Sequence, residues 1–329
     1  AHFTAPKAGK VTVTIELASD AAPFSAGDAI DGYVRITSDA RLKTGGAKAY
    51  LACRGVYVYD QPSQEGQPRR LARRVKDYVL QEARVASAGV LTRGTNVRYP
   101  LHFVVPRDAL PTHQGYACSI EWSLYATLDL AEAAPVHARQ ELLVAAIPPS
   151  TQLLQEAHQA VHATEICQLA MTLDRRIAAE GESVHGYLRI SPHESFDADE
   201  VRVLLLRVEN NPEGENHIVY ISQWDPTTGQ FEGESLPGGR GSTYVWLEDE
   251  MNLSGPLHLE VNDPKVFPFE LTVPKAWRPT IATIEGRVTW QVVSVVAQAL
   301  GDLRVSQDIV VHTGAPQLAR VLATPSAEA

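Results

Sequence analysis

An internal repeat constrains the fold of this chain more than any other feature. The segment SAGDAIDGYVRI (residues 25–36) returns, slightly changed, as AAEGESVHGYLRI (residues 178–190). In both copies a glycine and an acid precede a Gly-Tyr step, and an Arg-Ile pair ends the motif. The matched residues lie 154 positions apart: Gly27, Asp28, Gly32, Tyr33, Arg35 and Ile36 correspond to Gly181, Glu182, Gly186, Tyr187, Arg189 and Ile190.

A second pair of motifs extends the repeat. YPLHFVVPRDALPT (residues 99–112) aligns without gaps with FPFELTVPKAWRPT (residues 267–280) at an offset of 168, which Trp122 and Trp290 share. Because the offset grows from 154 to 168, the second copy carries about fourteen extra residues, which we place in the polar region 209–256. Such long copies indicate a duplicated domain with its own core rather than a solenoid repeat.

Apolar and polar residues alternate along many short segments. VTVTIEL (residues 11–17), CSIEWSLYATLDL (118–130), EVRVLLLRVE (200–209) and RVTWQVVSVVAQAL (287–300) all follow this pattern. It is typical of antiparallel strands with one buried face, and the chain's 22 Gly and 21 Pro cluster in the turns between them. We predict an all-β fold of two tandem immunoglobulin-like antiparallel β-sandwich domains.

The predicted domain boundaries follow from the repeat and from proline, which cannot donate to a strand ladder. The division is residues 1–147 for the N-terminal sandwich, 148–165 for a linker, 166–314 for the C-terminal sandwich and 315–329 for a tail. Within the linker, residues 152–163 have a helical composition, and we predict a short helix or ordered linker there.

Composition favours a soluble protein and disfavours some partners. Net charge is −10, so a nucleic-acid surface, which needs a basic excess, is not expected. No apolar run approaches the roughly 20 residues that cross a bilayer, and the N-terminus lacks the apolar core of a signal peptide. Cys53, Cys118 and Cys167 are odd in number and widely spaced, which predicts buried free thiols and a reducing, cytoplasmic location.

The ordered motifs resemble the arrestin fold, a pair of β-sandwiches in tandem. The first copy resembles an arrestin N-terminal domain in the Gly27-Asp28 to Gly32 spacing, in AYLACRGVYV (residues 49–58), and in the Leu110-Pro111 step. SIEWSLYATLDL (residues 119–130) resembles a family strand pattern, with Trp122 at an aromatic position. The second copy resembles a diverged C-terminal arrestin domain. This resemblance implies a binding protein rather than an enzyme.

The chain also departs from parts of that family. Its first strand lacks the phosphate-sensing lysine pair of visual and β-arrestins, and PPST (residues 148–151) is not the PPxY motif of α-arrestins. Residues 113–125 fit the retromer Vps26 type poorly. A bacterial arrestin-like protein of the sporulation-control (Spo0M-like) kind is the closer comparison, and the Ala- and Arg-rich composition agrees with a bacterial source. Receptor desensitisation is therefore not carried over.

Few residues have the spacing of a catalytic or metal site. His158 and His162, with Glu165 nearby, would share one face of a helix and could hold a metal; they equally suit a solvated linker. No GxSxG elbow or phosphate-binding glycine loop occurs. We interpret the acidic run Glu248–Glu250 as a solvated loop. We predict no cofactor.

Two clusters are candidates for binding. The basic cluster consists of Arg69, Arg70, Arg73, Arg74 and Lys76 and could bind a phosphorylated protein or an anionic headgroup, or simply be solvated. The aromatic cluster consists of Tyr220, Trp224, Phe231, Tyr244 and Trp246 and could anchor an interface or close one end of the sandwich. Exposed strand edges could add a partner strand.

We therefore predict a non-enzymatic cytoplasmic adaptor or scaffold in signalling or trafficking, which binds protein partners through sheet edges, end loops and the groove between its domains. The alternative is a β-sandwich module that binds carbohydrate or another small molecule. A third hypothesis is a metal-dependent enzyme at His158 and His162. The sequence leaves the partner's identity and any homo-oligomer open.

Overall fold

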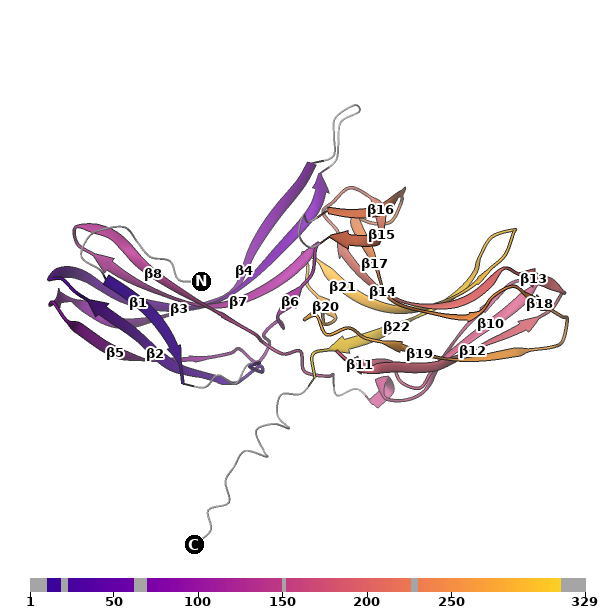
Figure 1. The fold of residues 1–329 in the computed structure, drawn as a ribbon, viewed down its shortest axis with the longest axis horizontal. Coiled ribbons are helices and arrows are strands. Elements are labelled where there is room, and N and C mark those ends of the chain that lie inside the picture. The colour runs from indigo at the N-terminus through magenta and orange to yellow at the C-terminus, as the bar shows by residue number, and fades with distance from the viewer. Residues whose placement is uncertain (1–10, 19–22, 62–69, 150–151, 226–229, 315–329) are drawn as a thin grey trace, which may run out of the picture.

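The computed structural model describes residues 11–18, 23–61, 70–149, 152–225 and 230–314. It consists almost entirely of β-strands, arranged as two sandwiches that lie side by side along the long axis and meet near the middle (Figure 1). The all-β prediction is confirmed. In the described part of the chain, no helix has the length and apolar character needed to span a bilayer.

The first half of the chain folds into two sheets. Its strands are β1 (Val11–Leu17), β2 (Ala29–Ser38), β3 (Leu42–Gln61), β4 (Arg70–Leu91), β5 (Thr95–Val104), β6 (His113–Gln114), β7 (Cys118–Leu130) and β8 (Ala133–Leu142). One sheet has the order β1-β2-β5, and the other has the order β4-β3-β7-β6 with β8 paired to β7. The inward positions of the alternating strands, such as Ile30, Leu51 and Trp122, form its core.

The second half forms a larger sandwich. Its strands are β9 (His158–Ala163), β10 (Cys167–Leu173), β11 (Ile177–Ala179), β12 (Ser183–Pro192), β13 (Phe196–Ala198), β14 (Glu200–Asn211), β15 (His217–Asp225), β16 (Gln230–Pro237), β17 (Ser242–Ser254), β18 (Leu257–Leu259), β19 (Lys265–Thr272), β20 (Ile281–Ala282), β21 (Arg287–Ala297) and β22 (Leu303–His312). A four-stranded sheet, β19-β12-β10-β9, packs against an eight-stranded sheet, β11-β22-β21-β14-β17-β15-β16, in which β20 pairs with β21. Leu169, Val203 and Trp290 belong to this core.

The two copies share side-chain contacts as well as sequence motifs. The indole Nε1 of Trp122 donates to the carbonyl of Leu110 at 2.9 Å, and that of Trp290 donates to the carbonyl of Arg278 at 3.0 Å. Both partners keep the offset of 168. Equivalent side chains therefore perform the same packing role in each sandwich, as a duplication requires.

The repeated Gly-Tyr step has a steric cause. A Cβ on Gly32 would lie 2.5 Å from the carbonyl oxygen of Glu16, and one on Gly186 would lie 2.3 Å from that of Thr172. These distances are far below van der Waals contact, so only glycine lets β2 approach β1, and β12 approach β10, so closely.

The extra residues of the second copy build two strands. β15 and β16 lie inside the predicted region 209–256, and β15 pairs in parallel with β17. β17 corresponds to β4 of the first sandwich, which among the described strands pairs with β3 alone. The insertion therefore covers a strand edge that is open in the first copy.

Of the two alternatives for residues 152–163, a short helix or an ordered linker, the helix is wrong. Only Gln152–Leu154 forms a single 3₁₀ turn, and His158–Ala163 is the strand β9, paired antiparallel with β10. A short isolated helix is marginal in water, whereas the open edge of β10 offers a row of backbone hydrogen bonds. Part of the predicted linker 148–165 thus joins a sheet of the second half, while the predicted domain boundaries stay a prediction.

Candidate functional site

Buried charge gathers where the two sandwiches meet. Among the described residues, the buried acids, arginines and histidines are Asp60, His113, Arg207, Glu209, His217 and Glu285. Each lies at or beside the contact between the halves, as the following contacts show. We call this set, with its partners, the polar joint. Burying charge is costly unless it is paired, so its concentration here needs a physical cause.

Arg207 and Glu209 form the centre of the joint. They occupy inward positions of β14, where the preceding inward residues are aliphatic. Arg207 is ion-paired with Glu209, donates from Nε to Glu248 at 2.6 Å, and lies over the ring of Trp246 at 5.0 Å. Burial lowers the pKa of Arg207 to about 10, against the opposing effect of Glu248.

The prediction that the acidic run Glu248–Glu250 is a solvated loop is wrong. The run belongs to β17, and the register of β17 against β14 shifts beside Glu248. Glu248 keeps the parity of Tyr244 and Trp246, whose side chains are buried, and its carboxylate accepts from Nε of Arg207. The alternation of β17 therefore extends inward to Glu248, a signal that the interpretation as a charge run overlooked.

Glu209 connects the halves through backbone donors. Its carboxylate accepts hydrogen bonds from the backbone N–H groups of Ala117 at 2.6 Å, Cys118 at 3.2 Å and Tyr116 at 3.2 Å. Successive N–H groups turned toward one anion form a nest, which stabilises a buried carboxylate. The loop before β7 is thereby fixed to the second sandwich.

A second contact joins the end of β3 to β15 and β17. Asp60 Oδ2 lies 2.7 Å from Nε2 of His217 and accepts from the hydroxyl of Tyr244 at 3.1 Å. Nδ1 of His217 lies 3.0 Å from the carbonyl oxygen of Glu215. Both ring nitrogens thus lie near oxygen acceptors, one from each half of the molecule.

A third contact involves β3, β4 and the turn before β21. The Glu285 carboxylate accepts from Lys76 Nζ at 2.8 Å and from the hydroxyl of Tyr78 at 2.7 Å. The Tyr57 hydroxyl lies 2.5 Å from that of Tyr78 and 3.1 Å from Thr283 Oγ1. Burial raises the pKa of Tyr78, so the phenol stays a donor at neutral pH.

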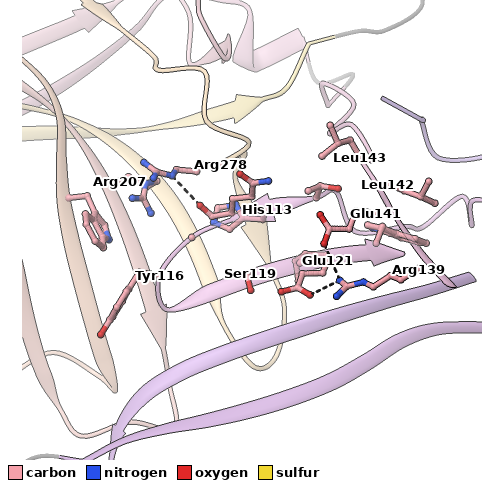
Figure 2. A pocket seen from close by; sticks show the side chains of 16 residues that line it. His113, Tyr116, Ser119, Glu121, Arg139, Glu141, Leu142, Leu143, Arg207 and Arg278 are labelled. Atoms are coloured by element: carbon pink, nitrogen blue, oxygen red, sulfur yellow. Dashed lines mark hydrogen bonds and ion pairs between the residues drawn. The ribbon is translucent and has the colours of Figure 1, made fainter. Parts of the chain in front are cut away.

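A groove opens beside the joint, with a volume of about 590 Å³ (Figure 2). We call it the interface groove. His113, Ser119, Trp122 and Arg139 line it from the first sandwich, and Arg207, Trp246 and Arg278 line it from the second. Arg139 is ion-paired with Glu121 and Glu141, while Arg278 donates to the Gln114 carbonyl at 3.1 Å. Its walls therefore carry charge of both signs.

His113 is the most deeply buried titratable group of the groove. Its Nδ1 lies 3.1 Å from the carbonyl oxygen of Pro279, to which a neutral ring donates. Burial, aided by the charge of Arg207, lowers the pKa of His113 to about 3. The ring is therefore neutral at physiological pH and serves as a hydrogen-bonded spacer between the halves.

The structure divides the predicted basic cluster. Arg74 and Lys76 are ion-paired with acids of the second half, and so belong to the joint. Arg70 and Arg73 are exposed on β4. Arg69 lies outside the described residues.

The predicted aromatic cluster is also divided. Tyr244 and Trp246 are buried at the joint, where their rings lie 5.1 Å and 6.0 Å from that of Tyr116. Tyr220 is 40% exposed on β15. The side chains of Trp224 and Phe231 lie outside the described residues, although β15 and β16 place the two opposite one another.

The predicted metal pair does not form a site. His158 and His162 lie four apart on a strand, which separates them by about 13 Å. His158 instead contacts Oε1 of Gln307 at 2.9 Å. No group of three or more candidate ligands occurs within the part of the chain that the structure describes. The helical geometry on which the metal-enzyme hypothesis depended is absent.

The cysteines are buried and unpaired, as their strand positions predict. Burial raises the pKa of Cys53 and Cys118 to about 12 and that of Cys167 to about 11. Such thiols are protonated and unreactive at neutral pH.

Sequence reasoning missed Asp60, Arg207, Glu209 and His217. One signal was available for two of them: in EVRVLLLRVE the inward positions are aliphatic until Arg207 and Glu209 replace them. Charged residues at core positions of an alternating strand indicate a buried partner. Asp60 and His217 carry no comparable local signal, because their contact joins strands distant in sequence.

Two antiparallel sandwiches with matching contacts define the fold as a pair of arrestin-type β-sandwiches. Residues 13–148 match the family model of the arrestin (or S-antigen) N-terminal domain, which supports the arrestin-fold family suggested by the motifs. The matched residues cover almost all strands of the first sandwich. Comparison with curated proteins finds no match. Closeness to the Spo0M-like or Vps26 types stays a prediction.

Proposed function

We propose that this protein is a non-enzymatic adaptor or scaffold that binds protein partners in cytoplasmic signalling or trafficking. In this proposal the chain has two arrestin-like domains, with boundaries near residues 147 and 166. The match to an arrestin N-terminal domain supports it, because that fold is known for binding rather than catalysis. Fold alone does not define function, so the proposal rests on the surfaces described above.

The observation that carries the proposal is that one groove is built from both sandwiches. The polar joint holds the halves together through three separate sets of buried polar contacts, and the interface groove lies beside it. A partner seated in the groove would contact Arg139 of one half and Arg278 of the other. Its affinity would then depend on how the halves are oriented, which links partner binding to domain movement.

The exposed part of the basic cluster gives a second element of the proposal. Arg70 and Arg73 face solvent near the end of the long β3–β4 hairpin, while Arg74 and Lys76 are occupied at the joint. Arginine is suited to planar, bidentate contacts with phosphate. These two side chains are the ones available to a phosphorylated partner or an anionic headgroup.

The test is recovery of partners that depend on the groove. The tagged protein would be expressed at its native level, and copurifying proteins would be quantified for wild type and for Ser119→Trp, whose indole would fill the groove. We expect at least one protein to be enriched with wild type and about tenfold less with the variant. Ser87→Trp, on the exposed part of β4, is the matched control.

Enrichment of no protein over an untagged control would contradict the adaptor function. Equal recovery by wild type and Ser119→Trp would instead show that partners bind elsewhere on the molecule. Both variants must first give the wild-type melting temperature.

A further inference from the structure

The outer face of the eight-stranded sheet is unusually apolar. Leu204 and Leu206 occupy outward positions of β14, where an exposed antiparallel sheet normally carries polar residues. Val293 of β21 is paired with Leu204, and Leu247 of β17 is paired with Leu206. Leu247 is 45% exposed. A contiguous apolar face of this kind marks an interaction site.

The first sandwich provides an internal comparison for this face. Cys53 pairs with Trp122 just as Arg207 pairs with Trp290, so β3 and β14 positions correspond at an offset of 154. Leu204, Leu206, Val293 and Val295 therefore correspond to Tyr50, Ala52, Tyr125 and Thr127.

A covering arginine is also lost in the second copy. Arg139 lies opposite Tyr125 and covers its ring, with 5.6 Å between guanidinium and ring centre. Ser306 lies opposite Val293 at the equivalent place and is too short to do so. The second sandwich has thus exchanged a mixed face for an aliphatic one, in which Val293 and Val295 are buried at 9% and 2% exposure and Leu247 is exposed.

The insertion found only in the second copy forms one wall of this face. Tyr220 and Ile221 of β15 and Leu236 of β16 border a trough of about 810 Å³, whose floor includes Leu204 and Val293. Tyr220 and Leu236 are 40% and 42% exposed. Val219 and Ile221 of the insertion pack into a buried cluster with Tyr244 and Trp246, whereas Tyr220 and Leu236 stay exposed beside the aliphatic floor, where they fit a binding role better than a packing one.

Charged groups lie at one end of the trough. Arg202, Val295 and Arg304 are paired in a row across β14, β21 and β22, which places the two arginines about 10 Å apart. Arg202 is ion-paired with Glu250 at 3.2 Å, and Arg304 with Asp302 at 2.8 Å. These pairs are partly exposed and therefore weak, so an incoming carboxylate can exchange with them.

The backbone groups that a surface leaves free for hydrogen bonding determine which kind of partner can bind there. An extended peptide needs a free strand edge for its backbone hydrogen bonds, but β14, β17 and β21, which form the floor, are each paired on both sides, and the free edge of the sheet lies beyond the wall, on β16. The face itself presents side chains only. A helix satisfies its own backbone groups and can place a stripe of apolar side chains, spaced i, i+3, i+4 and i+7, into a trough.

We propose that this trough binds an amphipathic α-helix of a partner protein, with its apolar stripe on Leu204, Leu206 and Leu247 and an acidic residue at Arg202 and Arg304. The proposal rests on the adaptor function and names one partner surface for it. The trough is separate from the interface groove, so a partner can occupy either surface.

A library of displayed helices tests this proposal directly. The probe is a set of 18-residue peptides with helix-forming backbones and randomised surface positions, selected on the full chain and counter-selected on Leu206→Lys. We expect the enriched peptides to share one apolar stripe with an acid at one end. Soluble copies should lose at least about tenfold in affinity on Leu206→Lys and on Leu247→Lys, measured by fluorescence anisotropy.

Controls separate binding in the trough from binding elsewhere on the molecule. Tyr50→Lys changes the corresponding position to Leu204 in the first sandwich and should alter affinity less than about twofold. Replacing a central residue of an enriched peptide by proline should abolish binding, because the helix breaks. Melting temperatures establish that each variant folds. Leu247, being exposed, is expected to tolerate lysine.

Three outcomes would overturn the proposal: no enrichment over the counter-selecting variant, equal binding to Leu206→Lys and wild type, or enriched peptides that bind in extended form. Stoichiometric binding of dodecanoate, sensitive to Leu206→Lys, in place of any peptide would also overturn it and assign the trough to a small amphiphile. If partners recovered from the native host depend on Ser119 but not on Leu206 or Leu247, the adaptor function stands and this inference fails.

Discussion

At the scale of single residues, the polar joint uses charge in positions that normally hold aliphatic side chains. Arg207 and Glu209 stand in the inward row of β14, and Glu248 and three backbone N–H groups complete their coordination. A buried pair adds little to stability compared with apolar residues, but removing one partner is strongly destabilising. The joint therefore fixes geometry more than it adds stability.

Glu209→Gln tests this role of the joint by replacing one carboxylate oxygen with an NH₂ group. The amide leaves Arg207 with one acid fewer and turns a donor toward Ala117 and Cys118. We expect a loss of about 3 kcal/mol in the free energy of unfolding, measured by urea denaturation. Glu82→Gln, which breaks an exposed pair with Lys48, should cost less than about 0.5 kcal/mol. Equal costs for the two variants would contradict the assigned role of Glu209.

His113 predicts a specific pH dependence. Burial and Arg207 lower its folded-state pKa to about 3, below the unfolded value of about 6.5. The unfolded chain therefore binds a proton that the folded chain rejects, and stability falls as pH decreases from 6.5 toward 3. The slope is about 1.4 kcal/mol per pH unit, or about 2 kcal/mol by pH 5.

The matched variant for this effect is His113→Asn, whose amide can still donate to Pro279. Its free energy of unfolding should fall less between pH 7 and pH 5 than that of wild type, by about 2 kcal/mol, in urea titrations at each pH. Parallel pH profiles for the two proteins would show that His113 is protonated inside the fold.

At the scale of elements, the repeated Gly-Tyr step determines how closely β2 approaches β1 and β12 approaches β10. Gly32→Ala and Gly186→Ala would each force a Cβ against a carbonyl oxygen of the neighbouring strand. Each should cost about 2 kcal/mol or more in the free energy of unfolding. Gly89→Ala is the control, since nothing lies within 4 Å of its added Cβ. An unchanged midpoint of urea-induced unfolding for Gly32→Ala would mean that β1 and β2 can move apart at little cost.

Much of the fold could be predicted from the sequence because strand periodicity and turn glycines are local signals. Gly27 and Gly181 both have a positive φ, at 88° and 85°, and the inward row of β7 from Cys118 to Leu128 is buried as its alternation predicts. The strand β9 could not be predicted, because its conformation comes from the edge of β10. The same holds for Asp60 and His217, whose contact depends on how two sandwiches are placed.

At the scale of the whole molecule, the duplication has produced two sandwiches with different surfaces. The first leaves β4 open along one edge, whereas the second covers the equivalent edge and exposes an aliphatic face beside it. The joint holds these surfaces in one orientation through contacts that are polar rather than aliphatic at their centre. Interfaces between domains of one chain resemble transient protein interfaces, which are more polar than permanent ones, so such a joint suits controlled movement better than a continuous apolar core would.

Asp60→Ala tests whether the joint sets that orientation. The substitution leaves His217 and Tyr244 without their shared acceptor but changes no core position within either sandwich. We expect the single unfolding transition of the wild type to separate into two in calorimetry, and the radius of gyration from small-angle scattering to increase. Asp77→Ala, which breaks the exposed pair with Arg54, should leave both unchanged. If Asp60→Ala also unfolds in one transition with unaltered scattering, the sandwiches are held by their apolar contacts instead, and partner binding cannot be coupled to this joint.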